Sequence, residues 1–203
     1  MINHETKCIF IHIPRCAGTY IELLIDKRDW WNVDIAQKHL SAKTSRNLYR
    51  EYWDEYFKFS FIRNPWSLEV SWYFWKKPFL KDIKFKEFIR DEDLNKTIKL
   101  SSGLNDRKFV NIFPNFINCY DYLQIENEIP LDFIGRYENL NDHLSLVSKK
   151  LNINLPMQNR LTPRQINRTE HSNYKDYYDD ETRQIVAKRY EKDINFFEFK
   201  FDE

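Results

Sequence analysis

Glycine, proline and cysteine are all scarce in this chain. Its 203 residues include 3 glycines and 7 prolines, which excludes collagen-like and linker-like sequences. The 3 cysteines, Cys8, Cys16 and Cys119, are too few and too odd in number for a disulfide framework. We therefore expect the protein to work in a reducing compartment, the cytoplasm.

The sequence also lacks long apolar runs and an excess of either charge. It has no stretch of roughly 18 uninterrupted apolar residues, and a strand-like segment begins near Lys7, where a signal peptide would need room. Lys and Arg number 32 against 31 Asp and Glu, a net charge of +1. Proteins that coat nucleic acid need a basic excess, so we expect neither a nucleic-acid partner nor a membrane anchor.

Large apolar side chains, in contrast, are abundant. Hydrophobic residues make up 42% of the chain and aromatic residues 17%, which is enough for a core and excludes global disorder. A chain of this length matches one domain of ordinary size. We expect a single domain over residues 1–203.

Three short apolar segments have the character of buried parallel strands: residues 7–13, 57–62 and 132–137. The first two each lead into a loop and a helix, which is the opening of an α/β unit. Helical patterns begin near Thr19 and cover residues 67–75, 83–89, 141–151 and 179–194. We predict an α/β fold with a P-loop-like central parallel sheet and helices on both faces.

The loop of residues 14–18, PRCAG, joins the first strand to its helix. Free backbone N–H groups and the helix dipole make such a junction suitable for a phosphate or sulfate. Arg15 adds a full charge, Thr19 a hydroxyl, and Gly18 lets the backbone approach a ligand closely. The Walker pattern G-x-x-x-x-G-K-[ST] is absent, and an ordinary strand-to-helix turn remains the alternative for this loop alone.

A second candidate site lies at the end of the second strand. Arg63 stands where open α/β sheets bind ligands, and Ser71 follows about two helical turns later. Together they would grip one anion, the arginine through its charged fork and the serine through its hydroxyl. The alternative is that Arg63 caps a carbonyl group or pairs with a nearby acid.

The two segments, FIHIPRCAGTY and FKFSFIRNPWSLEVSWY, occur together and in order. They resemble the carbohydrate-type sulfotransferases, often called sulfotransferase family 2, with their F-I-H-I-P-K-T-A-G-T-S and F-x-F-V-R-N-P-x-x-R-x-x-S-x-Y motifs. The block IGRYENL at residues 134–140 and the run from Tyr174 are also similar to that family. The resemblance covers most of the chain.

This resemblance implies a co-substrate, 3′-phosphoadenosine 5′-phosphosulfate (PAPS). The sequence has no C-x-x-C or H-E-x-x-H pattern, so we expect no required metal. The resemblance also implies that one set of residues wraps the 5′-phosphosulfate: Arg15, Cys16, Ala17, Gly18, Thr19 and Tyr20. Arg63 and Ser71 would hold the 3′-phosphate. Arg136, and Arg168 in a late loop, would lie near the nucleotide.

Three positions depart from the family motifs. Arg15 stands for the usual lysine, Cys16 for a threonine, and Leu68 for an arginine. An arginine is a planar fork and not a compact point charge, so Arg15 need not act as the lysine does. For Cys16, beside that charge, we favour inert packing over an oxidisable thiol.

His39 is the candidate catalytic base. It lies between the two nucleotide motifs, in a segment that resembles one with a histidine in the family, and an ordinary pKa of about 6.5 suits proton abstraction near neutrality. Glu22, Glu138 and His171 are the alternatives, and His12 has a smaller claim.

We predict an enzyme that moves a sulfuryl group from PAPS to a hydroxyl group of a small-molecule or carbohydrate acceptor, by in-line displacement with His39 as base and Arg15 stabilising charge. Two alternatives are a P-loop-type kinase and a non-catalytic nucleotide-binding relative. The sequence assigns neither the acceptor nor the oligomeric state.

Overall fold

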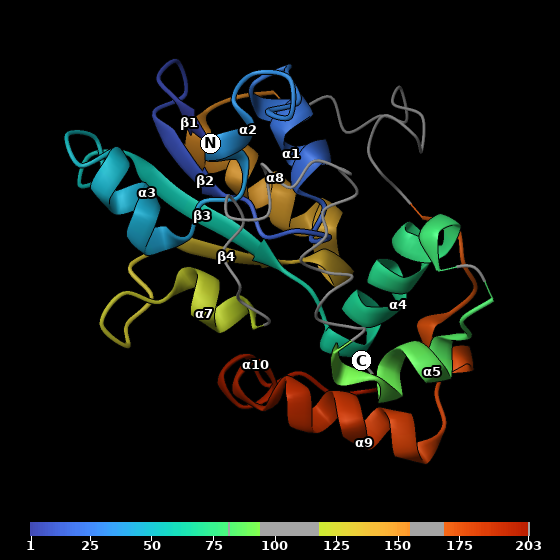
Figure 1. Cartoon of the computed structure of the whole chain (residues 1–203). Coiled ribbons are helices and arrows are strands. Elements are labelled where there is room, and N and C mark those ends of the chain that lie inside the picture. Colours follow the sequence, from blue (N-terminus) through green and yellow to red (C-terminus); the bar gives the residue numbers. More distant parts are fainter. Residues whose placement is uncertain (81, 94–117, 155–168, 203) are drawn as a thin grey trace. The chain divides into compact units, whose positions relative to one another are not determined.

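The computed structural model describes residues 1–80, 82–93, 118–154 and 169–202 (Figure 1). The chain divides into two compact units. Unit 1 comprises Met1–Arg63 and Cys119–Arg168, and unit 2 comprises Asn64–Asn118 and Thr169–Glu203. The single domain over residues 1–203 stays a prediction.

Unit 1 is built on one four-stranded sheet. In spatial order its strands are β1 (Ile2–Asn3), β2 (Cys8–Ile11), β3 (Phe57–Ile62) and β4 (Phe133–Arg136). Strands β2, β3 and β4 run parallel, as predicted, and Ser60 donates its hydroxyl to the carbonyl of Ile11 at 2.7 Å. Strand β1 was not expected; it is antiparallel to β2, so the sheet is mixed and not wholly parallel.

Helices cover both faces of this sheet (Figure 1). On one face Phe10, Phe59 and Phe61 form a buried core with side chains of α1 (Gly18–Ile25) and α8 (Leu140–Leu151). On the other face lie α3 (Ala42–Leu48) and α7 (Cys119–Leu123). This arrangement confirms the predicted α/β class, and explains why β2 is buried along its whole length.

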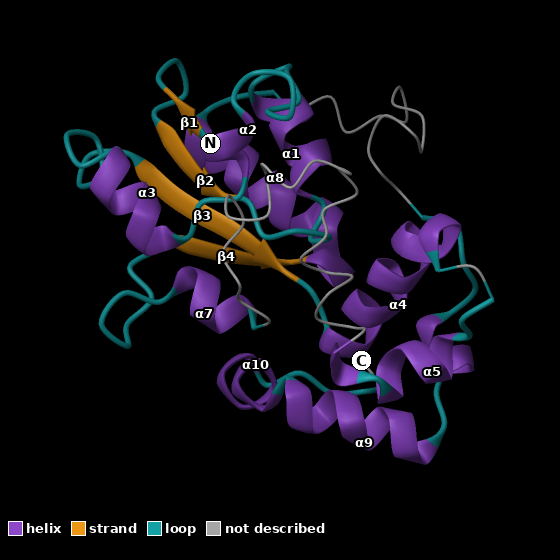
Figure 2. Ribbon diagram, in the orientation of Figure 1, coloured by secondary structure: helices purple, strands orange, loops and turns teal. Residues whose placement is uncertain are grey.

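The described part of unit 2 contains helices and turns (Figure 2). Its helices are α4 (Pro65–Lys76), η1 (Lys77–Phe79), α5 (Phe85–Arg90), η4 (Tyr174–Tyr177), α9 (Asp180–Arg189) and α10 (Glu191–Phe197). Helix α4 packs on α9, where the indole of Trp66 donates to the carbonyl of Arg183 at 3.0 Å and Arg189 pairs with the buried Glu69 at 3.1 Å. No helix among the described residues is long and apolar enough to cross a membrane.

The single helix expected over residues 179–194 is wrong. Tyr190 leaves the helical conformation, with φ −109° and ψ 25°, and separates α9 from α10. Its ring is buried, with 1% of its surface exposed, so packing of this side chain holds the break. Asp179 caps α9 as expected, because its side chain accepts from the backbone N–H of Thr182.

Candidate functional site

The carboxyl ends of β2, β3 and β4 meet at one edge of the sheet of unit 1. Because the strands are parallel neighbours, the residues that follow them come together there. Arg63, after β3, donates from Nη1 to the backbone carbonyl of Arg15, after β2, at 3.1 Å. Its guanidinium also lies over the ring of Tyr137, after β4, at 3.8 Å from the ring centroid. The capping alternative for Arg63 is therefore partly right, since one nitrogen caps a carbonyl.

Charge is concentrated at this edge. Arg63 is buried, with 4% of its surface exposed, and Arg15 is half-buried. Burial, and then the charge of Arg63, lower the pKa of Arg15 from 12.5 to about 9, which still leaves the Arg15 guanidinium a cation at neutral pH. Two partly desolvated cations that repel each other form a place that a multivalent anion would stabilise.

The loop that carries Arg15 has an unusual backbone. Arg15 and Ala17 have φ values of 65° and 64°, in the left-handed region that non-glycine residues rarely adopt. Left-handed residues in a loop turn successive N–H groups towards one side and form the concavities that bind phosphates. Ala17 is the N-cap of α1 and its side chain makes no capping hydrogen bond. This backbone is compatible with an anion at the start of α1, and the anion site itself stays a prediction.

Gly18 is required at this position by its contact with His12. A Cβ atom on Gly18 would lie 1.9 Å from Cδ2 and 2.0 Å from Nε2 of the His12 ring. That ring is 3% exposed, so it has little room to move away. The imidazole of His12 thus packs directly against the first residue of α1.

Behind His12 lies a buried group of charged side chains. The carboxylate of Glu22, 0% exposed, accepts from Nδ1 of His12 at 2.6 Å, from Nζ of Lys38 at 2.6 Å and from the backbone N–H of Trp30 at 3.3 Å. Lys38, 3% exposed, also pairs with Asp29. We call Glu22, His12 and Lys38 the buried triad. It connects the end of β2, helix α1 and α2 (Ile35–Lys38).

His39 follows α2 and lies against the buried triad. Its Nδ1 is 3.0 Å from the carbonyl oxygen of His12, and the two rings meet edge to face with centroids 4.3 Å apart. A carbonyl oxygen only accepts, so Nδ1 of His39 carries the proton and Nε2 holds the lone pair. Burial, and then the neighbouring His12, lower the pKa of His39 well below 6.5, so its imidazole is neutral at pH 7. These are the properties of a general base.

The other sequence-predicted residues are distributed as follows. Cys16, Thr19 and Tyr20 lie in the loop or in α1; the Cys16 thiol is buried, in keeping with packing, and Thr19 falls inside the helix, because α1 begins at Gly18. Arg136 ends β4, and its backbone N–H donates to Nδ1 of His143 at 2.7 Å. Ser71 belongs to unit 2, so its pairing with Arg63 stays a prediction. Arg168 lies outside the described residues.

The sequence analysis did not identify Lys38 and Asp29, which form ion pairs beside the candidate site. Glu22 could have been recognised as a buried charge, because it is the only charged side chain in the apolar helix GTYIELLI. Nothing in the sequence marks Lys38 as buried, because a lysine in the polar segment IAQK is ordinarily solvated and its burial depends on tertiary contacts.

Within the described residues, no group of three or more His, Cys, Asp and Glu side chains could hold a metal ion.

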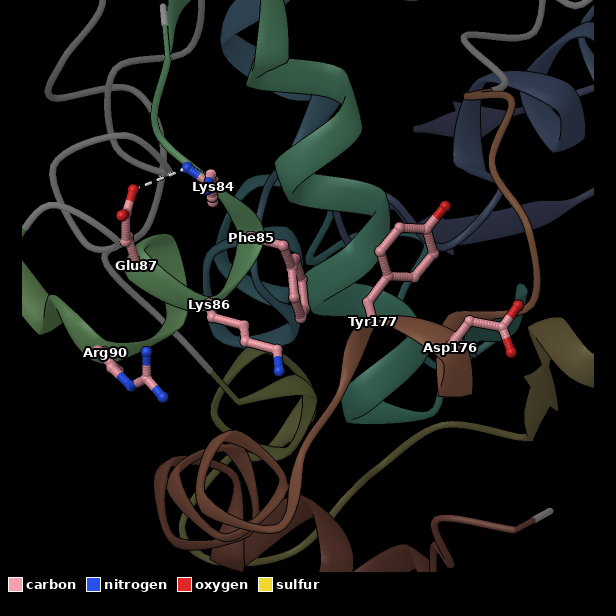
Figure 3. A pocket seen from close by; sticks show the side chains of 7 residues that line it. All are labelled: Lys84, Phe85, Lys86, Glu87, Arg90, Asp176 and Tyr177. Carbon is pink, nitrogen blue, oxygen red and sulfur yellow. Dashed lines mark hydrogen bonds between the residues drawn. The ribbon is translucent and has the colours of Figure 1, made fainter.

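Unit 2 has a pocket of about 370 Å³ between α5 and η4, lined in part by Phe85 and Tyr177 (Figure 3). Two cations that line it are already paired, Lys86 with Asp179 at 2.9 Å and Arg90 with Glu181 at 2.6 Å.

We expect Lys38→Met to lower the free energy of unfolding by about 3–5 kcal/mol, because it leaves the buried carboxylate of Glu22 without its cation. Urea denaturation at pH 7.5 measures this change. Arg28→Ala is the control: Arg28 is exposed, and its partner Asp26 keeps the hydrogen bonds from Asn3 and Trp30, so the midpoint should change far less. A loss below about 1 kcal/mol for Lys38→Met would contradict the buried ion pair, since exposed pairs contribute that little.

Comparison with known proteins places this sequence in a family. A family model described as the sulfotransferase family matches residues 1–200. An uncharacterized protein of Archaeoglobus fulgidus is 29% identical over 106 residues, which are 51% of this chain and 74% of that protein. No solved structure matches significantly. The match over nearly the whole chain agrees with the motifs at the ends of β2, β3 and β4, and the chain belongs to the sulfotransferase family.

Proposed function

We propose that the protein transfers a sulfuryl group from PAPS to a hydroxyl group of a carbohydrate or related small-molecule acceptor. The observation that carries this proposal is the meeting of Arg15 and Arg63 beside the left-handed loop before α1. PAPS has anionic groups at both its 5′ and 3′ positions, and a sulfotransferase that uses it needs cations for both. Family membership supports the sulfotransfer itself.

In this proposal the loop of residues 15–19 binds the 5′-phosphosulfate through its backbone N–H groups and the charge of Arg15. One nitrogen of Arg63 is hydrogen-bonded to the carbonyl of Arg15, and its guanidinium lies over the ring of Tyr137. The orientation of the guanidinium is therefore fixed before a ligand arrives. A fixed guanidinium loses little entropy when it binds a phosphate. Arg63 would therefore hold the 3′-phosphate, with Ser71 and Arg136 as the further contributors predicted from the sequence.

His39 is the base in this proposal. Its Nε2 accepts the proton of the acceptor hydroxyl while that oxygen bonds to sulfur and the sulfur–oxygen bond to the 5′-phosphate breaks. The hydrogen bond from Nδ1 to the carbonyl of His12 keeps the lone pair on Nε2. Arg15 stabilises the charge that develops on the departing phosphate.

The first test is calorimetric titration with adenosine 3′,5′-bisphosphate, with AMP, ADP and ATP as comparisons. We expect the bisphosphate to bind best, and Arg63→Ala to weaken it by roughly 1.5–3 kcal/mol, or about 10- to 150-fold, because a charged hydrogen bond is lost. Arg63→Lys should fall between, since it keeps the charge without the fork.

Arg28→Ala is the matched control on the same unit, and should bind the bisphosphate as the wild type does. Stronger binding of ATP would favour a kinase-like protein. Absence of binding to any of the four nucleotides would contradict the proposal as a whole.

The second test concerns His39. We expect the rate of PAPS-dependent product formation, measured over a panel of mono- and oligosaccharide acceptors, to be flat from pH 8 to about 6.5 and to fall only at lower pH. The sign follows from the lowered pKa of His39, because a base is lost when the pH falls through its own pKa. His39→Ala should slow the reaction about 10²–10⁴-fold and leave bisphosphate affinity within about threefold of wild type.

His171→Ala is the comparison, since His171 was among the alternative bases that the sequence offered. A large loss of rate in His171→Ala, with His39→Ala as active as wild type, would transfer the role to His171.

A further inference from the structure

We propose that Glu22 is a positioning residue that holds His39 in the orientation and tautomer of a base. Glu22 does not contact His39 in this account; it acts through its two partners in the buried triad. The inference rests on the proposed function of His39, and it adds a residue whose role the family match does not assign.

The first connection runs through His12. Glu22 accepts from Nδ1 of His12 at 2.6 Å, and the backbone carbonyl of the same His12 is the acceptor for Nδ1 of His39 at 3.0 Å. The ring of His12 also lies edge to face with that of His39, at 4.3 Å between centroids. A shift of His12 would therefore move both the carbonyl oxygen that accepts from His39 and the ring that packs against His39.

The second connection runs through Lys38, the residue before His39 in the chain. Its Nζ lies 2.6 Å from the other oxygen of Glu22. Lys38 is the last residue of α2 and His39 is its C-cap, with φ −117° and ψ 40°. An ion pair that fixes Lys38 thus fixes the end of α2 from which the His39 side chain projects.

Both connections start from one carboxylate that is wholly buried. Its two oxygens face different donors, Oε1 towards His12 and Oε2 towards Lys38, and a third donor, the backbone N–H of Trp30, also reaches Oε2. A neutral amide could keep both contacts only if His12 moved its proton from Nδ1 to Nε2, because the amide nitrogen only donates. The carboxylate form of Glu22 is what joins the two connections.

Asp29 offers the matched control. It shares Lys38 with Glu22, and it accepts from the backbone N–H of Trp31 at 3.0 Å. Asp29→Asn removes one charge beside the same lysine, but leaves both contacts of Glu22, with Lys38 and with His12, in place. General destabilisation would appear in both Asp29→Asn and Glu22→Gln, whereas loss of His39 positioning should appear in Glu22→Gln alone.

The test is ¹⁵N NMR of histidine side chains in the full-length protein at pH 7.5, with the His39 signals assigned by their loss in His39→Gln. In the wild type we expect one neutral tautomer with the proton on Nδ1. Glu22→Gln should give a mixture of the two neutral tautomers of His39, with a detectable signal for the proton on Nε2, and Asp29→Asn should match the wild type. If Glu22→Gln does not fold, Glu22→Asp, which keeps the charge but is one methylene shorter, should give the same mixture.

A kinetic comparison distinguishes this inference from the proposed function on which it rests. With the acceptor panel above, Glu22→Gln should lose tenfold or more in kcat while the KM for PAPS stays within threefold. A wild-type tautomer pattern in a folded Glu22→Gln or Glu22→Asp variant would overturn the positioning role, whatever the enzyme catalyses. Failure of the wild type to bind adenosine 3′,5′-bisphosphate would instead reject the proposed function and leave the tautomer result standing.

Discussion

The candidate site depends on one buried carboxylate. Glu22 is 0% exposed, and a carboxylate in that position is tolerated only when its oxygens are fully hydrogen-bonded. Its donors come from three separate places in the chain: His12 at the end of β2, Trp30 in the loop after α1, and Lys38 at the end of α2. Satisfying this one group therefore brings together the loop before α1 and the segment that carries His39.

The second constraint is the parallel sheet. Neighbouring parallel strands end at the same edge, so Arg15, Arg63 and Tyr137 meet there although they are far apart in sequence. The contact of His12 with Gly18 couples this edge to the buried triad, because only a glycine fits beside the ring. In the proposed function, anion binding and proton abstraction would thus share one support within unit 1.

The local features of this arrangement could be predicted from the sequence, and the tertiary ones could not. Phe57–Ile62 was predicted with the bounds that the structure has, because its side chains are suited to a strand buried on both faces. The loop of residues 14–18 between a strand and a helix was also predicted, because its neighbours on both sides have clear local patterns. The burial of Lys38, the break at Tyr190 and the antiparallel β1 depend on contacts with distant residues, and local periodicity carries no information about those.

The account's central claim is that one edge of the sheet in unit 1 holds both ends of a 3′-phosphorylated nucleotide. A crystal structure with adenosine 3′,5′-bisphosphate tests it most directly. The account predicts the 5′-phosphate against the backbone of residues 15–19 and the 3′-phosphate within hydrogen-bonding distance of the Arg63 guanidinium. A nucleotide bound away from both, or one whose 3′-phosphate points into solvent without contacting Arg63, would contradict it.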